Sequence, residues 1–174
     1  ILFAIGGDGT LRGALKIGEA AGRRGLKIGV IGVPKTIDND ISFVQRTFGF
    51  ETAVTEAWRA TSAANAEAEA ARNGIGLVKL MGRDSGFIAA YSALVNNEVN
   101  FCLVPEVPFT LKGFLSALQQ RLERRSHAVI VVAEGAGQDL MGSGQERDAS
   151  GNVKYGDIGV FLRNAITDHF KRAG

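Results

Sequence analysis

The stretch ILFAIGGDGTLRGALKIGEAAG, residues 1–22, decides the fold of this chain. Its apolar run breaks into two glycines, which are followed by an acid, a third glycine and a hydroxyl. The residues after Thr10 are typical of a helix. A strand that ends in a glycine turn and leads directly into a helix indicates an α/β protein. The single carboxylate in the turn, Asp8, needs a chemical explanation of its own.

Apolar runs and amphipathic stretches alternate along the rest of the chain. The runs predict strands over residues 1–6, 27–33, 75–80, 99–104 and 128–133. The stretches between them predict helices over residues 10–24, 49–73, 85–96, 111–125 and 157–172, and a polar, glycine-rich segment predicts a long surface loop over 135–157. No run clearly alternates apolar and polar residues, which is typical of strands buried on both faces. We therefore predict an α/β fold with a Rossmann-like, mostly parallel sheet and helices on both faces.

Composition excludes several classes of protein. The chain has 174 residues, of which 45% are hydrophobic, and a formal net charge of +2, as expected for a globular domain with a sizeable core. No apolar run approaches the ~20 residues of a membrane span. Basic residues occur only in small clusters among acids, so we expect neither a membrane nor a nucleic acid as a partner. The only cysteine, Cys102, lies in an apolar run and is expected to be buried.

Ligands of parallel sheets bind at the carboxyl ends of the strands, where GGDGT (residues 6–10) lies. Its small residues allow backbone N–H groups and the next helix N-terminus to approach phosphate oxygens. A carboxylate at Asp8 would repel phosphate unless a divalent cation lay between them. Mg²⁺ is commonly bound by one carboxylate and phosphate oxygens, so Asp8 is a candidate metal ligand. The alternative is that Asp8 only caps the helix.

A second polar cluster, PKTIDND (residues 34–40), follows the second predicted strand. It carries two carboxylates, Asp38 and Asp40, at the same predicted sheet edge as Asp8. A hydroxyl group that accepts a phosphoryl group needs a residue to take its proton, and a loop carboxylate can do this. An ordinary turn also favours the sequence Asp-Asn-Asp, so the cluster alone leaves both interpretations open.

Three motifs together resemble one family. GGDGT is similar to the phosphate-binding stretch of NAD kinases, diacylglycerol-type lipid kinases and phosphofructokinases, whereas PKTIDND resembles a signature of the 6-phosphofructokinase family alone. MGRDSGF (residues 81–87) is similar to the Met-Gly-Arg segment of that family. The stretches IGLVKLMGRDSGFIAAYSAL and VIVVAEGAGQDL most resemble the plant and protist branch of its ATP-dependent members.

The resemblance implies the phosphofructokinase fold and transfer of a phosphoryl group from ATP to the 1-hydroxyl of fructose 6-phosphate in glycolysis. The catalytic residues would be Asp38, as the base that removes the hydroxyl proton, and Arg83, whose fork of donors suits phosphate oxygens. The implied substrate-binding residues are Thr36, Ile37, Asp38, Asp40, Met81, Gly82, Arg83 and Glu134. The implied ATP-binding residues are Gly7, Asp8, Gly9, Thr10 and Gly13, with Asp8 on the side of Mg²⁺.

The resemblance also implies that residues 1–174 are a single partial domain. It matches the centre of the family domain, without the N-terminal glycine-rich loop or the C-terminal subdomain, so we expect these residues alone to be inactive. His127 and His169 do not match the sugar-phosphate pattern of the family and are interpreted as structural or surface residues. The whole protein is expected to form a homo-oligomer in the cytoplasm, or in a plastid if a targeting segment precedes it.

Two alternatives stay open, namely a pyrophosphate-dependent phosphofructokinase and a non-catalytic regulatory homologue. Lys35 resembles the pyrophosphate enzymes, which have a lysine before TIDND. Gly9 resembles the ATP enzymes, since the pyrophosphate enzymes resemble GGDD at that point. An aspartate at position 9 would exclude ATP, whereas a lysine excludes neither donor, so Gly9 favours ATP. A regulatory homologue would have no need of Asp8, Asp38 and Arg83.

Overall fold

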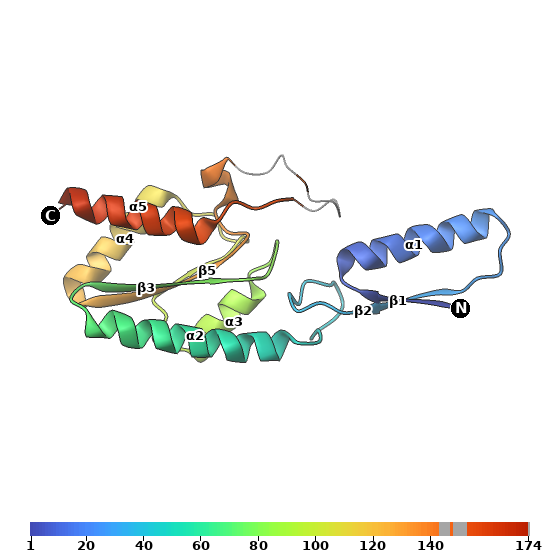
Figure 1. The fold of residues 1–174 in the computed structure, drawn as a ribbon, viewed down its shortest axis with the longest axis horizontal. Coiled ribbons are helices and arrows are strands. Elements are labelled where there is room, and N and C mark those ends of the chain that lie inside the picture. Colours follow the sequence, from blue (N-terminus) through green and yellow to red (C-terminus); the bar gives the residue numbers. More distant parts are fainter. Residues whose placement is uncertain (143–146, 148–152, 174) are drawn as a thin grey trace. The chain divides into compact units, whose positions relative to one another are not determined.

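The computed structural model of the chain describes residues 1–142, 147 and 153–173 (Figure 1). These fall into two compact units, residues 1–51 and 52–174. The strands are β1 (Leu2–Gly6), β2 (Val30–Pro34), β3 (Gly74–Leu80), β4 (Phe101–Leu103) and β5 (His127–Ala133). The helices are α1 (Asp8–Arg23), α2 (Phe50–Ala70), α3 (Phe87–Val95), α4 (Leu111–Arg124) and α5 (Ile158–Ala173), with a short 3-10 helix, η1 (Gln138–Met141). The predicted alternation of strands and helices is confirmed.

The first unit is a parallel pair of strands covered by one helix. β1 pairs with β2 in the register Leu2 to Val30 through Gly6 to Pro34. Helix α1 packs on the face of this pair that carries Val30 and Gly32, since a methyl group at Gly32 would lie 2.8 Å from the side chain of Leu11. Glycine at this position therefore allows the helix to approach the sheet closely.

The other face of this strand pair corrects one expectation. Phe3 and Ile5 of β1 and Ile31 of β2 are exposed, so within the first unit a helix covers only one face of these strands. The first unit contains the β1–β2 sheet, and the second unit contains the sheet of β3, β5 and β4. An apolar run specifies a strand, but its neighbours depend on hydrogen bonds to distant residues, which the run does not encode.

The second unit matches the predicted architecture closely. Its sheet has the order β3-β5-β4 and all pairs are parallel. Residues 128–133 of the central strand β5 are each 0% exposed, as expected for an apolar run without alternation. Helices α4 and α5 lie on one face of the sheet and α2 and α3 on the other (Figure 1). Leu118 of α4 and Leu162 of α5 pack against Ile130 in the larger core cluster.

Helix α2 approaches β3 closely because glycines and alanines meet there. A methyl group at Gly76 would lie 2.8 Å from the carbonyl oxygen of Ala64, and one at Gly74 would collide with the carbonyl oxygen of Ala68. The alanine-rich sequence of α2 thus favours the helix and leaves a flat surface for the strand. Among the described residues, no helix has both the length and the apolar character needed to cross a membrane.

We expect Gly76→Ala to lower the free energy of unfolding by about 1–3 kcal/mol, since the added methyl group overpacks a contact with backbone that has no room to move. Chemical denaturation followed by far-UV circular dichroism measures this. Gly22→Ala is the matched control, because nothing lies within 4 Å of that position on α1. In a helix interior the same change should stabilise by up to about 1 kcal/mol. Equal effects of the two substitutions would contradict the close approach of α2 to β3.

Cys102 is the second correction. The sequence predicted a buried cysteine, but its side chain is exposed. The reason is the position of β4 at an edge of the three-stranded sheet, with β5 as its only partner among the described residues. The predicted loop over 135–157 contains η1, and its residues 143–146 and 148–152 lie outside the described part of the chain.

Candidate active site

The GGDGT segment joins β1 to α1 as a strand-to-helix turn. Helix α1 begins at Asp8, earlier than the sequence predicted. Its N-cap residue is Gly7, which has no side chain to cap the helix. Gly6 is buried against Thr10, whose side chain would collide with a methyl group there. The first N–H groups of a helix have no intrahelical partner and carry favourable partial charge for an anion. This end of α1 therefore has the features of a phosphate-binding helix N-terminus.

Space is available at the glycines assigned to the nucleotide. Nothing lies within 4 Å of a methyl group placed at Gly9 or Gly13, and the nearest atom at Gly7 is the carbonyl oxygen of Lys35 at 3.8 Å. These three glycines are thus not required by packing within the first unit, in contrast to Gly6. Their role in binding ATP stays a prediction.

Asp8 lies in the first turn of α1, where its carboxylate forms an ion pair with Arg12 one turn later. The alternative that Asp8 caps the helix is wrong, because Asp8 is inside the helix and Gly7 occupies the N-cap position. The hydrogen bond and the charge of Asp8 raise the pKa of the exposed Arg12 guanidinium. The described residues contain no cluster of three or more histidine, cysteine or acidic side chains that could hold a metal. Asp8 fits a Mg²⁺ that takes one carboxylate and substrate phosphates, the usual mode for this ion.

The PKTIDND loop follows β2 in the same unit and lies next to the GGDGT turn. The N–H group of Lys35 donates to the carbonyl oxygen of Gly6 over 2.8 Å, which extends the β1–β2 pairing into the loop. Thr36 accepts a hydrogen bond from the N–H group of Asp38 through its hydroxyl oxygen at 3.1 Å. Asp38 is half-buried, whereas Asp40 is exposed. All three predicted carboxylates, Asp8, Asp38 and Asp40, therefore follow neighbouring parallel strands.

Sequence reasoning missed Asn39, the residue that organises this loop. Asn39 has a positive φ of 57°, and its side-chain oxygen accepts the N–H group of Thr47 at 2.9 Å. Its side-chain amide also donates to the carbonyl oxygen of Gln45 over 3.4 Å. Asparagine tolerates the left-handed conformation better than most residues, which was the available signal. Ile37 lies against the backbone of Gly49, which has a φ of 86°.

In the second unit, the MGRDSGF segment forms a tight turn between β3 and α3. Gly82 has a φ of 147° and Arg83 a φ of 52°, so two successive residues adopt conformations that L side chains rarely take. Ser85 donates to the carbonyl oxygen of Gly82 over 2.9 Å from both its N–H group and its hydroxyl group. A non-glycine residue with such a φ persists only where its surroundings hold it there, and such residues concentrate at functional sites. Met81 is exposed before this turn.

Glu134 lies directly after β5 and holds the Arg83 turn. Its carboxylate accepts the N–H group of Arg83 at 3.0 Å. Its neighbour Gly135 is required for the same approach, because a methyl group there would collide with the carbonyl oxygen of Arg83. Arg83 and Glu134, both assigned to the substrate by the sequence analysis, therefore lie together at one strand-end edge. The contact uses the backbone of Arg83, which the sequence analysis did not foresee.

Other residues of the second unit have structural roles. Glu106 accepts the N–H group of Gly86 at 2.8 Å, at the start of α3. His127 lies 3.6 Å from the carboxylate of Glu69, and His169 lies 3.1 Å from the side-chain oxygen of Gln119. The interpretation of both histidines as structural or surface residues agrees with these contacts.

Asp157, at the start of α5, makes the pH dependence of this region testable. Its pKa is lowered by the hydrogen bond with Lys79, at 2.9 Å, and by the N–H group of Val160, at 3.1 Å. A carboxyl group with a pKa lower in the folded than in the unfolded state stabilises the fold at pH values above its unfolded pKa. This contribution is lost as the pH falls through the lower, folded value.

We therefore expect Asp157→Asn, which removes the charge but can still cap the helix, to flatten the decline of the thermal midpoint between about pH 6 and pH 3. Melting curves of the wild type and the variant across this range measure the difference. Asp168→Asn, on the exposed side of α5, is the matched control. Parallel pH curves for the wild type and Asp157→Asn would show that the pair with Lys79 contributes nothing.

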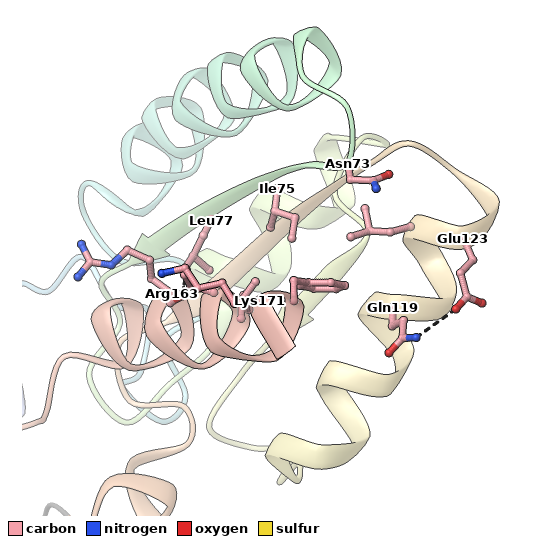
Figure 2. Close-up of a pocket in the computed structure, with 11 residues that line it drawn as sticks. Asn73, Ile75, Leu77, Gln119, Glu123, Arg163 and Lys171 are labelled. Atoms are coloured by element: carbon pink, nitrogen blue, oxygen red, sulfur yellow. Dashed lines mark hydrogen bonds between the residues drawn. The ribbon is translucent and has the colours of Figure 1, made fainter. Parts of the chain in front are cut away.

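A pocket lies elsewhere in the second unit. It measures about 800 Å³ and is formed by α4, α5 and the amino-terminal half of β3 (Figure 2). Its lining residues include Asn73, Ile75, Leu77, Gln119, Glu123 and Arg163. This pocket adjoins the start of β3, whereas Arg83 and Glu134 follow the carboxyl ends of their strands. It therefore does not include the candidate active site.

The predicted site residues thus come together in two groups, one in each unit. The first group holds Gly7, Asp8, Gly9, Thr10, Gly13, Thr36, Ile37, Asp38 and Asp40, and the second holds Met81, Gly82, Arg83 and Glu134. In both groups the residues follow the carboxyl ends of parallel strands or begin the next helix, which is where α/β proteins bind ligands. Each group also depends on a residue with positive φ, Asn39 in the first and Arg83 in the second.

Comparison with known proteins identifies the family. Parallel strands with glycine turns, carboxylates and an arginine at their ends define an α/β ligand-binding protein, and a family profile described as Phosphofructokinase matches residues 1–174. The chain belongs to the phosphofructokinase family.

Several curated relatives support the assignment. The chain is 53% identical over 181 residues to "ATP-dependent 6-phosphofructokinase" of Borreliella burgdorferi, covering 98% of this chain and 40% of that protein. It is 57% identical over 166 residues to the protein of the same name from Trypanosoma cruzi, covering 95% of this chain and 34% of that protein. It is 53% identical to "ATP-dependent 6-phosphofructokinase 7" of Arabidopsis thaliana, covering 98% of this chain and 36% of that protein. The chain therefore spans between 34% and 40% of the length of these relatives.

Solved structures share the fold. A pyrophosphate-dependent phosphofructokinase from Marinobacter aquaeolei superposes with a TM-score of 0.66 at 28% identity, covering 98% of this chain and 41% of that one. A second, from Nitrosospira multiformis, gives a TM-score of 0.73 at 23% identity, covering 97% and 42% respectively, and indicates the fold alone. The expected resemblance to the phosphofructokinase family and its fold is confirmed.

Proposed function

We propose that the protein containing this chain transfers the terminal phosphoryl group of ATP to the 1-hydroxyl of fructose 6-phosphate, which gives fructose 1,6-bisphosphate. The observation that carries this proposal is the hydrogen-bonded junction of the GGDGT turn with the PKTIDND loop in one unit. The first offers a helix N-terminus suited to phosphate, and the second a half-buried carboxylate suited to a proton. The names of the relatives, ATP-dependent 6-phosphofructokinase, point to the same reaction.

Asp38 is the proposed general base. The hydrogen bond from its N–H group to the hydroxyl of Thr36 and the contacts of Asn39 with residues 45–47 hold the loop in one conformation. A carboxylate fixed in this way can accept the proton of the 1-hydroxyl while that oxygen attacks the phosphoryl group in line. Thr36, Ile37 and Asp40 of the same loop complete the proposed sugar-binding segment.

Arg83 and Glu134 are the proposed partners on the substrate side, together with Met81 and Gly82. The guanidinium of Arg83 carries a permanent positive charge and a planar fork of donors, which suit the charge that spreads over phosphoryl oxygens in the transition state. The carboxylate of Glu134 accepts the N–H group of Arg83 and retains further lone pairs that can accept sugar hydroxyls. Glu134 would thus orient both the substrate and the arginine.

ATP is assigned to the start of α1. Gly7, Gly9, Thr10 and Gly13 would surround its phosphates, where open space at the glycines permits close approach of the backbone. Asp8 would hold the Mg²⁺ of the nucleotide. When bound, this ion would supply positive charge that neutralises the charge developing on the phosphates. Arg12, which pairs with Asp8 in this structure, would then have to give up that contact.

The pyrophosphate-dependent reaction is the second candidate. Lys35 favours it, and the similar structure from Marinobacter aquaeolei is named a pyrophosphate-dependent phosphofructokinase. An enzyme-coupled assay of the whole natural protein with fructose 6-phosphate distinguishes the two. We expect turnover with Mg²⁺ and ATP and negligible turnover with Mg²⁺ and pyrophosphate. No turnover with either donor would favour the regulatory homologue instead. Light scattering on the same preparation tests the expected homo-oligomer.

A further inference from the structure

Three successive residues, Tyr155, Gly156 and Asp157, are each attached to a different part of the second unit. The Tyr155 hydroxyl donates to the carboxylate of Asp84. The side chain of Gln138 accepts the N–H group of Gly156 at 2.9 Å and donates to its carbonyl oxygen over 3.2 Å. Asp157 forms the ion pair with Lys79 of β3. This segment is therefore held side by side with the ends of β3 and β5, far from it in sequence.

Tyr155 lies among the charged groups of the Arg83 turn. Burial raises the pKa of its phenol, and the hydrogen bond and charge of Asp84 raise this pKa further. The charge of Glu134 also raises it, whereas the charge of Arg83 lowers it. The phenol consequently keeps its proton at neutral pH and acts as a donor to the carboxylate. Gln138 adds a second connection to the same place, since its side chain donates to the carbonyl oxygen of Glu134 over 2.6 Å.

The Arg83 turn requires such support. Arg83 has the left-handed φ of 52°, which a residue with a side chain adopts at a free-energy cost unless its neighbours hold it. Glu134 holds the N–H group of Arg83 from one side. On the other side, the next residue in the chain, Asp84, is held by Tyr155. Two contacts with residues distant in sequence thus bracket the strained position.

We propose that Tyr155 is a positioning residue, whose hydrogen bond to Asp84 holds the turn that presents Arg83 to the transferring phosphoryl group. This rests on the proposed function of Arg83. Tyr155 acts through Asp84 and takes no part in proton transfer. Loss of the phenol hydroxyl releases one side of the turn, so Arg83 samples other backbone conformations and meets the transition-state charge less often.

The experiment uses Tyr155→Phe, Asp84→Ala and the double variant in the whole natural protein. Tyr91→Phe and Asp168→Ala are the matched controls, since both side chains are exposed on helices, α3 and α5. Hydrogen–deuterium exchange of a peptide over residues 81–86 reports on the turn, and a peptide over residues 111–124 in α4 serves as the internal reference. Steady-state kinetics with ATP and fructose 6-phosphate gives kcat and KM for each variant.

We expect Tyr155→Phe and Asp84→Ala each to speed exchange of the turn peptide about tenfold and to leave the α4 peptide unchanged. Each should lower kcat about 10- to 100-fold with KM for the sugar within about threefold of the wild type. The double variant should be no worse than either single variant, because both remove the same hydrogen bond. The controls should match the wild type in every measurement.

Two results would overturn the proposal, and a third concerns only the proposed function. Unchanged exchange in Tyr155→Phe would show that the phenol does not hold the turn. Faster exchange with unchanged kcat, or effects that add in the double variant, would reduce Tyr155 to a structural residue. A wild-type protein without phosphofructokinase activity would refute the proposed function, while the exchange measurement would still decide whether Tyr155 holds the turn.

Discussion

Replacement of Asp38 by alanine or serine is expected to lower kcat by about 10²–10⁴-fold in the whole natural protein, the range typical of a lost general base. The loop should keep its shape, because the variants retain the contacts of Asn39 with Gln45 and Thr47 and the backbone N–H group that residue 38 donates to Thr36. Fructose 6-phosphate should therefore bind with a similar KM. Coupled assays measure both parameters.

Asp168→Ala controls for removal of an exposed carboxylate from the same protein and should leave kcat unchanged. Circular dichroism of the Asp38 variants confirms that they fold. Turnover within about threefold of the wild type in a folded Asp38→Ala variant would exclude Asp38 as the base. Asp40, the exposed carboxylate of the same loop, would then be the remaining candidate for the base.

Gly9→Asp is expected to reduce ATP-dependent turnover by at least about 100-fold, the scale of a like-charge contact of several kcal/mol. In this structure nothing lies within 4 Å of a methyl group at Gly9, so the protein itself has room for the new side chain. An acidic residue in the first turn of a helix is also favourable for the helix dipole. Loss of activity would therefore report repulsion of the nucleotide and not a damaged fold.

Gly22→Asp, at the other end of α1, introduces the same charge where nothing lies within 4 Å and should keep ATP-dependent turnover near that of the wild type. Isothermal titration with Mg²⁺ and a non-hydrolysable ATP analogue separates binding from catalysis. Retained ATP binding and turnover in Gly9→Asp would contradict the assignment of this turn to the nucleotide. Substantial pyrophosphate-dependent turnover in the unmutated protein would contradict the choice of donor.

Much of the candidate site could be predicted because it consists of short contiguous motifs. GGDGT, PKTIDND and MGRDSGF each lie at the carboxyl end of a strand, and the structure places them there. The residues that orient these motifs were harder to predict. Asn39 contacts residues a few positions away, whereas Tyr155 reaches Asp84 across 71 positions of sequence. A lone tyrosine after a polar loop carries no local signal of such a partner.

Local sequence also determined the strands and helices to within a few residues, because apolar runs and alanine-rich amphipathic stretches prefer these conformations regardless of their neighbours. The buried run of β5 is the clearest example, since its six apolar residues from Ala128 to Ala133 specify a strand covered on both faces. The first helix was placed only approximately. Asp8 and Gly9 read as turn residues, but a glycine N-cap followed by an acid in the first turn is also an ordinary helix start.

Only the tertiary structure decided which strands pair, which faces are covered and how Arg83 is held. The apolar runs around Cys102 and Phe3 resemble that of β5, yet both residues are exposed. Cys102 is exposed because β4 lies at a sheet edge, and Phe3 because α1 covers only one face of the β1–β2 pair. The left-handed backbone of Arg83 is equally invisible in its own segment. It depends on Glu134 and, through Asp84, on Tyr155. The physical reason is that local preferences act over a few residues, whereas burial and backbone strain depend on contacts between residues that only folding brings together.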